Sequence, residues 1–354
     1  MSQKTALIMA GGTGGHIFPG LAVAHALRDK GWRVHWLGAP GSMESRLVPP
    51  QGFALEVIDF SGVRGKGLRS LLLLPMRLLR ALVQSVQVMR KVRPQVVVGL
   101  GGYISFPGGL VAALLRKPLV LHEQNSVAGM ANKVLARVSS RIFTAFPQVL
   151  AQGSWVGNPL RSNFLTQANP QVRFAGRAGP LRLLVVGGSL GATALNSVVP
   201  QALALMTPAL RPVVTHQSGE KQIDTLRAHY AAAGVEATLT PFIDDTAQAF
   251  ADADLVLCRA GASTVTEIAA VGAAAVFVPF PSAVDDHQTH NARFLVDQQA
   301  AWLLPQSELS PQGLANWLQK IDRAALLERA LKAKTCQKTG ATDAVVAACE
   351  ELCA

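Results

Sequence analysis

TALIMAGGTGGHIFPG, residues 5–20, is a short apolar run followed by four glycines and then by a pattern typical of a helix. LRLLVVGGSLGATALN, residues 181–196, repeats this order in the second half of the chain. Each segment predicts a buried strand, a tight turn and a helix whose N-terminus offers backbone N–H groups to a phosphate. Two such turns predict two similar α/β domains that face each other across a cleft.

Apolar runs alternate with helical patterns in both halves, which is typical of doubly wound parallel sheets. In the first half we expect a helix over Pro19–Lys30 and strands over Thr5–Ala10, Arg33–Leu37, Val96–Leu100 and Leu119–His122. In the second half we expect a helix over Thr193–Met206 and strands over Leu181–Val186, Arg211–His216, Ala237–Thr240, Leu255–Cys258 and Ala274–Pro279. The predicted fold class is therefore α/β, with two Rossmann-like doubly wound domains.

Turn-forming residues mark the expected link between the halves, Gln152–Asn163. The last expected helix, Ala341–Cys353, is a candidate to pack back onto the first half. Disorder is expected at most near Gln167–Gly179.

The composition describes a soluble α/β protein with an anionic partner. The chain has 354 residues, 49% of them hydrophobic, and a net charge of +11. Such a charge fits nucleic acid, a phosphorylated substrate or an anionic membrane surface. The four cysteines show no paired CxxC spacing, so reduced thiols in a cytoplasmic protein are expected and a zinc site is not. The first apolar run is too short for a signal peptide, and any membrane contact is expected to be peripheral.

The glycine turns do not fit two common nucleotide-binding patterns. Neither turn matches G-x-G-x-x-G with an acidic residue at the end of the next strand, which argues against a nicotinamide cofactor. No Gly-Lys-Ser/Thr follows either turn, which argues against a P-loop. One alternative stays open for each turn, namely that its glycines only allow close packing of helix on sheet.

Two further segments carry polar groups directly after expected strands, where ligands bind in open α/β sheets. In CRAGASTVTE, residues 258–267, a small-residue turn opens a helix, and Glu267 could accept two hydrogen bonds from a vicinal diol such as a ribose. The alternative for Glu267 is a carboxylate that complements the helix dipole. The second segment is DDHQTHNA, residues 285–292.

Seven motifs, taken together, resemble the MurG-type family, the membrane-associated GlcNAc transferases of bacterial peptidoglycan synthesis. They occur in the family's order and cover nearly the whole chain. These motifs are GGTGGH at 11–16, GGYISFPG at 101–108, HEQN at 122–125, GNPLR at 157–161, GGSLGA at 187–192, CRAGASTVTE at 258–267 and DDHQTHNA at 285–292.

The resemblance implies an inverting glycosyltransferase of the GT-B fold. It would move GlcNAc from UDP-GlcNAc to the 4-hydroxyl of MurNAc-pentapeptide on undecaprenyl diphosphate, converting lipid I to lipid II. The acceptor and the membrane would bind residues 1–161 plus 340–354, and UDP-GlcNAc would bind residues 162–339. No cofactor and no metal are expected. The resemblance places the enzyme at the cytoplasmic face of the bacterial inner membrane, with cell-wall and cell-division proteins as possible partners.

The same resemblance implies a set of substrate-binding residues. Ser189 and its turn would hold phosphate, the Ile243 backbone uracil, Glu267 the ribose hydroxyls, and Gln288 with Asn125 the sugar. The full set is Thr13, Gly14, Gly15, Asn125, Arg161, Ser189, Ile243, Ala262, Ser263, Thr264, Val265, Thr266, Glu267 and Gln288.

An inverting transfer needs a base that takes the proton of the acceptor hydroxyl. His16 is the first candidate because it closes the first glycine turn, and a neutral imidazole is a good proton acceptor near neutral pH. The alternative is that His16 only binds an acceptor phosphate. Glu123 is the second candidate base, with Tyr103 and His122 as supporting groups. The one Asp-x-Asp, Asp252–Asp254, is expected to be a pair of surface carboxylates at a helix end.

Leu68–Val92 mixes leucines with arginines, and Arg64 and Lys66 precede it. A basic and apolar segment suits contact with an anionic membrane, whereas the alternative is an ordinary helix with one buried face. Nucleic acid is not expected, because no known binding module is present and only 6% of residues are aromatic. Three competing functions are a related glycolipid glycosyltransferase, a UDP-sugar epimerase of similar architecture, and a non-catalytic subunit that binds nucleotide sugar or membrane.

Overall fold

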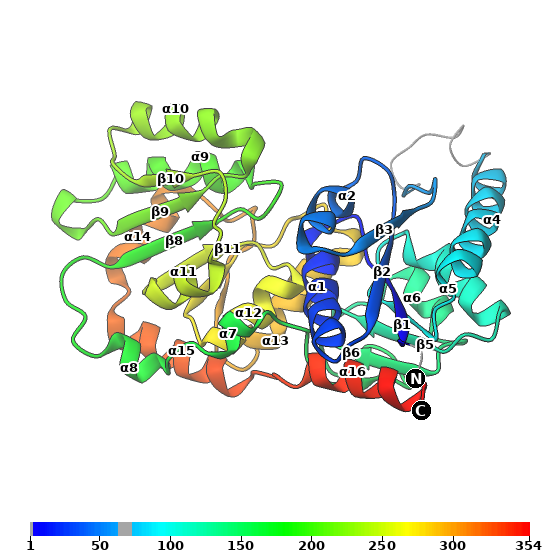
Figure 1. Cartoon of the computed structure of the whole chain (residues 1–354). Coiled ribbons are helices and arrows are strands. Elements are labelled where there is room, and N and C mark those ends of the chain that lie inside the picture. The colour runs from blue at the N-terminus through cyan, green and yellow to red at the C-terminus, as the bar shows by residue number, and fades with distance from the viewer. Residues whose placement is uncertain (1–2, 63–72) are drawn as a thin grey trace. The chain divides into compact units, whose positions relative to one another are not determined.

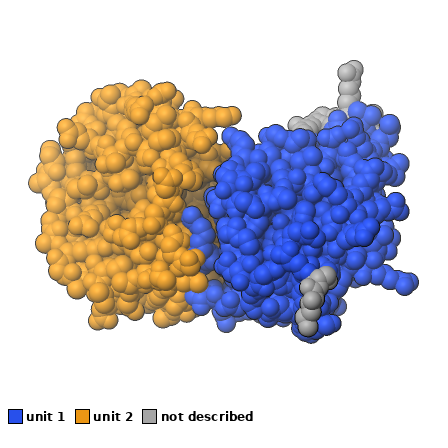
Figure 2. Space-filling model, viewed as in Figure 1, with its two compact units in different colours: residues 1–161, 338–354 blue, residues 162–337 orange. Residues whose placement is uncertain are grey.

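The computed structural model describes residues 3–62 and 73–354. The chain forms two compact units (Figures 1 and 2). Unit 1 comprises Met1–Arg161 and Lys338–Ala354, and unit 2 comprises Ser162–Gln337. Each unit is built on its own sheet and has its own hydrophobic core.

In the described part of unit 1, the strands form one parallel sheet in the order β3-β2-β1-β4-β5-β6-β7. The strands are β1 (Thr5–Met9), β2 (Arg33–Gly38), β3 (Ala54–Val57), β4 (Val96–Gly99), β5 (Leu119–Glu123), β6 (Arg141–Thr144) and β7 (Ser154–Trp155). The helices are α1 (Gly14–Asp29), α2 (Met43–Leu47), α4 (Leu74–Val92), α5 (Ser105–Leu114), α6 (Met130–Leu135) and α16 (Ala341–Glu351), with a 3₁₀ turn, η1, at Pro49–Gln51.

Helices cover both faces of this sheet, so its central strands β1, β4 and β5 are buried at every position. Along β1, Ala6 and Ile8 pack in one core cluster and Leu7 and Met9 in the other, as the alternation of side chains along a strand requires. α1 and α16 lie side by side in the first cluster, to which α16 contributes four buried side chains, Val345, Val346, Ala348 and Cys349 (Figure 1). α4 and α5 supply side chains to the second cluster.

In unit 2 the strands form a second parallel sheet, in the order β10-β9-β8-β11-β12-β13. The strands are β8 (Arg182–Val186), β9 (Val213–Gln217), β10 (Thr238–Thr240), β11 (Leu255–Cys258), β12 (Ala275–Phe277) and β13 (Trp302–Leu303). The helices are α7 (Ser162–Leu165), α8 (Pro170–Phe174), α9 (Thr193–Ala204), α10 (Ile223–Ala233), α11 (Thr246–Asp252), α12 (Ala262–Val271), α13 (His287–Val296), α14 (Pro311–Lys320) and α15 (Arg323–Thr335). The 3₁₀ turns are η2 (Pro208–Leu210), η3 (Glu220–Gln222) and η4 (Val284–Asp286).

The predicted fold class is confirmed, since both sheets are parallel and doubly wound. The predicted start of the first helix is wrong. We expected the helix to begin at Pro19, but α1 begins at Gly14 and Pro19 lies inside it. The N–H groups of His16 and Ile17 already bond to the Thr13 carbonyl, at 3.1 and 3.2 Å, so the first turn forms before the proline. Pro19 removes a single helical hydrogen bond, which the rest of the helix tolerates.

The segment in which we expected disorder instead clamps unit 2 together. The Arg173 guanidinium on α8 donates to the carbonyls of Ala251, Val271 and Gly272, at the ends of α11 and α12. Cations at these positions complement the negative ends of the helix dipoles.

The expectation of two surface carboxylates is also wrong for Asp254, which is fully buried, although Asp252 is exposed. Arg177 and Arg323 donate to its two carboxylate oxygens, at 2.6 and 3.0 Å. Burial alone would raise the pKa of Asp254, but these hydrogen bonds and that of the Arg182 N–H outweigh burial and lower it. Asp254 is therefore a structural anchor.

We predict that Asp254→Ala lowers the free energy of unfolding by about 3–5 kcal/mol, because it leaves the buried Arg177 guanidinium without its carboxylate partner. The matched control is Asp252→Ala, which should stay within about 0.5 kcal/mol of the parent. A lowered pKa stabilises the fold above the unfolded-state value, and this contribution is lost as pH falls through the folded-state pKa. The difference between the free energies of unfolding of the two variants, measured with urea, should therefore decrease as the pH is lowered. Equal losses at neutral pH would contradict the assignment.

Candidate active site

The candidate residues of unit 1 gather at the carboxyl edge of its sheet. β4 pairs with both β1 and β5 in parallel, so the loops that follow these three strands lie side by side. The chain order of the strands reverses between β1 and β4, and open α/β sheets bind ligands at such a point. This edge carries GGTGGH, GGYISFPG and HEQN.

Glycines allow the loops after β1 and β4 to touch through their backbones. Gly102 has a positive φ of 80°, and a Cβ there would lie 2.3 Å from the Gly11 carbonyl oxygen. The buried Ser105 hydroxyl lies 2.9 Å from the Met9 carbonyl oxygen and 2.7 Å from that of Gly101, which ties the two strand ends together. The Tyr103 ring lies over Gly12, where a Cβ would approach it to 3.3 Å. The two motifs therefore form one structural element.

A buried carboxylate, Glu44, lies directly behind the first glycine turn. It accepts hydrogen bonds from the N–H groups of Ala39 and Gly12, each at 3.1 Å. A Cβ at Gly11 would lie 2.6 Å from its Oε1. The Gly12 N–H is thus used within the protein, and any anion binding by this turn depends on Thr13, Gly14 and Gly15 at the start of α1.

The two candidate bases have different environments. His16 is half-buried, and its Nδ1 lies 3.0 Å from Oε1 of Gln124. Glu123 is only 2% exposed, and its carboxylate accepts hydrogen bonds from the N–H groups of Asn125 and Gly129 and from Nδ2 of Asn132, at 2.9, 3.1 and 2.8 Å. Glu123 is therefore placed to hold the loop that carries Asn125, and this geometry favours positioning over the proton acceptance we expected of it.

The two expected supporting groups are both held uncharged. His122 is fully buried, its Nε2 lies 2.8 Å from the Gly157 carbonyl oxygen, and burial lowers its pKa to about 4. Burial, aided by the charge of Glu44, raises the pKa of Tyr103.

The guanidinium of Arg161 lies over the ring of Phe18 on α1, 5.3 Å from its centroid. Arg161 and Asn125, two of the expected substrate-binding residues, both lie in unit 1.

The candidate residues of unit 2 gather at the carboxyl edge of the second sheet. β8 and β11 are neighbours where the strand order reverses, and α9 and α12 begin just after them. Two helix N-termini at one switch point can bind a diphosphate, because their first N–H groups have no partner within the helix. Ser189 is exposed in the turn before α9.

The turn that holds Ser189 is fixed by close backbone contact and by two glutamines. Gly191 has a φ of 77°, and a Cβ there would lie 2.1 Å from the Ser218 carbonyl oxygen. Gln217 accepts from the Gly188 N–H and donates to the Gly188 carbonyl, both at 3.1 Å. Nε2 of Gln222 donates to the Leu190 carbonyl at 3.0 Å.

A buried chain of neutral side chains supports Gln222. Asn196 donates to Oε1 of Gln222 at 2.9 Å, and its own Oδ1 lies 3.0 Å from Nε2 of His216. The other ring nitrogen of His216 lies 3.0 Å from the Tyr230 hydroxyl. Burial lowers the pKa of His216 to about 3 and raises that of Tyr230, so neither group is charged near neutral pH. The chain needs no ionisation to hold the turn.

The expected ligand-binding residues at the start of α12 fall into two groups. Val265 is fully buried and its N–H bonds to the Gly261 carbonyl at 3.0 Å. The Thr266 hydroxyl lies 3.0 Å from the Ala262 carbonyl oxygen, within the helix. The side chains of Val265 and Thr266 thus make contacts within the protein, and their expected contact with a ligand stays a prediction. The first-turn backbone of Ala262, Ser263 and Thr264 and the half-buried carboxylate of Glu267 remain candidates.

The remaining expected residues lie after β10 and β12, at the same edge. Ile243 is half-buried in the loop that leads to α11. Gln288, on α13, accepts a hydrogen bond from the Phe280 N–H at 2.9 Å, so its NH₂ group is the part that can donate to a ligand. Sequence reasoning missed Arg259, which holds this loop by donating to the carbonyls of Val278 and Pro279 at 3.0 and 3.1 Å.

Within the described ranges 3–62 and 73–354, no cluster of three or more His, Cys, Asp or Glu side chains could hold a metal ion. No helix in these ranges is both long and apolar enough to cross a membrane.

Comparison with known proteins agrees with this geometry. Residues 6–144 match the glycosyltransferase family 28 N-terminal domain, and residues 182–346 match the glycosyltransferase family 28 C-terminal domain. The chain is 73% identical, over 99% of both chains, to the UDP-N-acetylglucosamine–N-acetylmuramyl-(pentapeptide) pyrophosphoryl-undecaprenol N-acetylglucosamine transferase of Paracidovorax citrulli. It is 58% identical to that of Cupriavidus metallidurans, again over 99% of both chains.

Solved structures show the same relationship. MurG of Acinetobacter baumannii superposes with a TM-score of 0.83 at 40% identity, covering 98% of this chain and 99% of that one. The calicheamicin glycosyltransferase CalG4 covers both chains fully at 15% identity with a TM-score of 0.70, which shows the shared fold. Fold and matched domains define a glycosyltransferase of the GT-B fold. Within that class the chain belongs to the MurG family, which confirms the resemblance seen in the sequence.

We predict that Gly191→Ala destabilises unit 2 more than Gly188→Ala does. Both glycines have a positive φ, which costs an alanine about 1–2 kcal/mol. A Cβ at Gly188 meets no atom within 4 Å, whereas one at Gly191 collides with the backbone, and such overpacking adds about 1–3 kcal/mol. Thermal unfolding of the two variants measures the difference, and equal melting temperatures would refute the close contact.

Proposed function

We propose that this chain transfers GlcNAc from UDP-GlcNAc to the 4-hydroxyl of MurNAc-pentapeptide on undecaprenyl diphosphate. The observation that carries the proposal is the 73% identity, over nearly the whole of both chains, to a transferase whose name states this donor and acceptor.

Unit 2 is proposed to bind the donor. The amides at the starts of α9 and α12 face one switch point and can bind the two phosphates of UDP-GlcNAc. In this proposal Glu267 accepts from the ribose hydroxyls, and the NH₂ group of Gln288 donates to the sugar. The same amides stabilise the negative charge that develops on UDP as it leaves.

Unit 1 is proposed to bind the acceptor, with His16 as the base. The acceptor hydroxyl oxygen forms a bond to the anomeric carbon of GlcNAc while its proton passes to His16. The bond from the anomeric carbon to the UDP oxygen breaks, and UDP leaves with the electron pair. Attack opposite to the leaving group inverts the anomeric centre. Thr13, Gly14, Gly15, Asn125 and Arg161, at the edge of unit 1, are proposed to complete the site.

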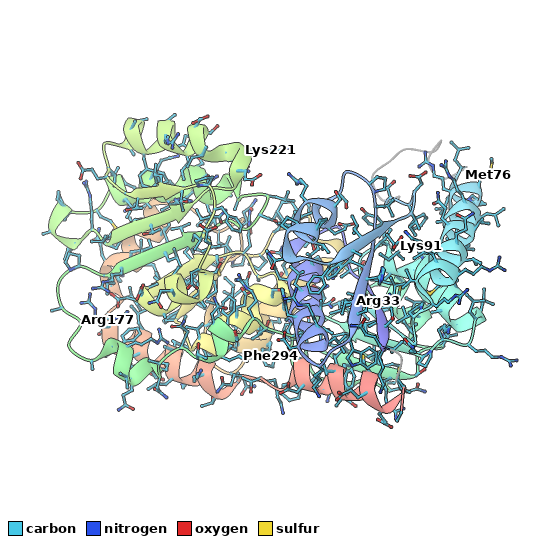
Figure 3. The ribbon with its side chains drawn as sticks, viewed as in Figure 1. Arg33, Met76, Lys91, Arg177, Lys221 and Phe294 are labelled. Carbon is cyan, nitrogen blue, oxygen red and sulfur yellow. The ribbon has the colours of Figure 1, made fainter. Side chains whose placement is uncertain are left out.

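The enzyme is proposed to bind the cytoplasmic face of the inner membrane as a peripheral protein, because its acceptor carries a lipid tail. α4 supports this proposal. Leu78, Leu82 and Val86 on one face pack against the core, but Met76 and Leu79 are 71% and 63% exposed (Figure 3 shows Met76). The helix thus has the one buried face expected of an ordinary helix and, in addition, an apolar outer face.

Arginines flank this outer face, and both Arg77 and Arg80 are exposed. An apolar stripe with cations beside it suits the interface of an anionic bilayer. The earlier part of the segment, residues 68–72 with Arg69, lies outside the described residues, as do Arg64 and Lys66. Binding to cell-wall or cell-division proteins stays a prediction.

We predict different kinetic effects for two variants in an assay of labelled UDP-GlcNAc with a lipid I analogue. Glu267→Ala should raise KM for UDP-GlcNAc about 10- to 100-fold, since hydrogen bonds to a charged group contribute about 1.5–3 kcal/mol. His16→Ala should lower kcat about 10²- to 10⁴-fold with little change in KM, because general base catalysis is lost. Asp252→Ala is the control. If the parent chain forms no lipid-linked disaccharide, the proposed function is wrong. If the parent is active and His16→Ala is equally active, the function stands and the proposed base is wrong.

We predict that the outer face of α4 carries membrane binding. Met76→Ser with Leu79→Ser removes exposed apolar area, and Arg77→Gln removes a cation that contributes about 1 kcal/mol near an anionic surface. The triple variant should float markedly less with liposomes that contain anionic lipid. The matched control is Leu205→Ser, on unit 2, where the native leucine is 53% exposed. Flotation equal to that of the parent would refute the placement of the membrane contact.

A further inference from the structure

The imidazole of His16 has a defined neighbour at its inner nitrogen. Nδ1 lies 3.0 Å from the side-chain oxygen of Gln124, the third residue of the HEQN motif. The two residues are 108 positions apart in the chain and meet because β1 and β5 both end at this edge, with β4 between them. Sequence reasoning assigned no role to Gln124.

The surroundings leave this contact little freedom. Gln124 is 1% exposed, so its side chain cannot turn out to solvent. Gly101, with a φ of 91°, covers the pair: a Cβ there would lie 2.9 Å from Nδ1 of His16 and 3.2 Å from Oε1 of Gln124. The Ser105 hydroxyl donates to the Gly101 carbonyl oxygen at 2.7 Å, which holds Gly101 in place. The Glu123 carboxylate accepts hydrogen bonds from the N–H groups of Asn125 and Gly129, which fixes the backbone just after Gln124.

The chemistry of the two atoms determines which ring nitrogen carries the proton. In the orientation that the structure gives Gln124, the amide oxygen faces Nδ1 and the amide Nε2 is buried without a partner among the described residues. An amide oxygen only accepts hydrogen bonds, so in this orientation Nδ1 donates. A neutral histidine that is protonated at Nδ1 has its lone pair on Nε2. We propose that Gln124 is a positioning residue that sets the tautomer and ring orientation of His16, so that Nε2 is the atom that accepts the acceptor's proton.

A glutamine differs from the carboxylate that could occupy this position. A carboxylate would stabilise the imidazolium ion and so keep more of the histidine protonated, and unable to act as a base, at a given pH. The neutral amide orients the ring without placing a charge beside it. This inference rests on the proposed role of His16 as the base.

Two substitutions separate orientation from charge. Gln124→Leu removes the acceptor, and kcat should fall at least tenfold while KM for UDP-GlcNAc changes less than twofold. Gln124→Glu keeps an acceptor oxygen and adds a charge, so kcat should be retained at alkaline pH while the acidic limb of the pH–rate profile moves to higher pH. The charged and titratable groups on the surrounding elements, Glu44, Tyr103, Glu123 and Arg161, are the same in both variants and the parent. Gln152→Leu, at an exposed glutamine of unit 1, is the matched control.

A direct measurement does not depend on activity. Nitrogen-15 NMR of the histidine side chains of the parent, with His16 assigned by its loss in His16→Asn, should show Nδ1 protonated and Nε2 unprotonated at neutral pH. Protonation of Nε2 in the parent would overturn the proposal, as would parent-like kcat in Gln124→Leu or an unmoved acidic limb in Gln124→Glu. If His16→Ala retains full turnover while the NMR result holds, the tautomer assignment stands and the proposed base is the part that fails.

Discussion

Both candidate sites depend on contacts between backbones that no side chain separates. In unit 1 the loop after β4 lies against Gly11, with Gly102 at the point of contact; in unit 2 the loop after β9 lies against Gly191, with Gly219 opposite. A methyl group at Gly219 would lie 2.6 Å from the Gly191 N atom, so at these glycine positions neither loop has room for a residue with a side chain. These contacts bring adjacent loops together at the carboxyl edges. The starts of α1 and α9 are thereby held at fixed places beside the switch points.

Buried polar side chains complete what the glycines permit. A glycine turn left to itself has many conformations, because glycine populates positive φ freely. Glu44 fixes the first turn through its hydrogen bonds to Ala39 and Gly12. Gln217 and the chain from Gln222 to Tyr230 fix the second. Glu44, Gln217, Asn196, His216 and Tyr230 are buried, so breaking one of their hydrogen bonds would leave an unsatisfied polar atom at a cost of about 1–3 kcal/mol. The turns are therefore arranged before any substrate arrives.

The sequence predicted the centre of each sheet better than its edges. β1, β4, β8 and β11 were all expected within two residues of their observed bounds, because strands covered on both faces are continuous apolar runs. β3, β6, β7 and β13 were not expected. They are four residues or shorter, and β3, β7 and β13 lie at sheet edges, where the pattern is mixed. The start of α1 was misplaced because a proline is most common in the first helical turn, a preference that the Thr13 carbonyl overrode.

The glycine motifs revealed where ligands bind, but the side chains behind them were not predictable. Glu44, Gln124 and Gln217 act on partners 29 to 108 positions away, and no local pattern records such pairs. Their chemistry also distinguishes two turns that look alike in sequence. A carboxylate supports the first turn and takes one of its N–H groups, which opposes a phosphate there and suits a neutral sugar. Gln217 and Gln222, which support the second turn, are neutral amides, so neither adds a negative charge near the N-terminus of α9. This difference supports the proposed placement of the donor's phosphates on unit 2 and of a sugar hydroxyl on unit 1.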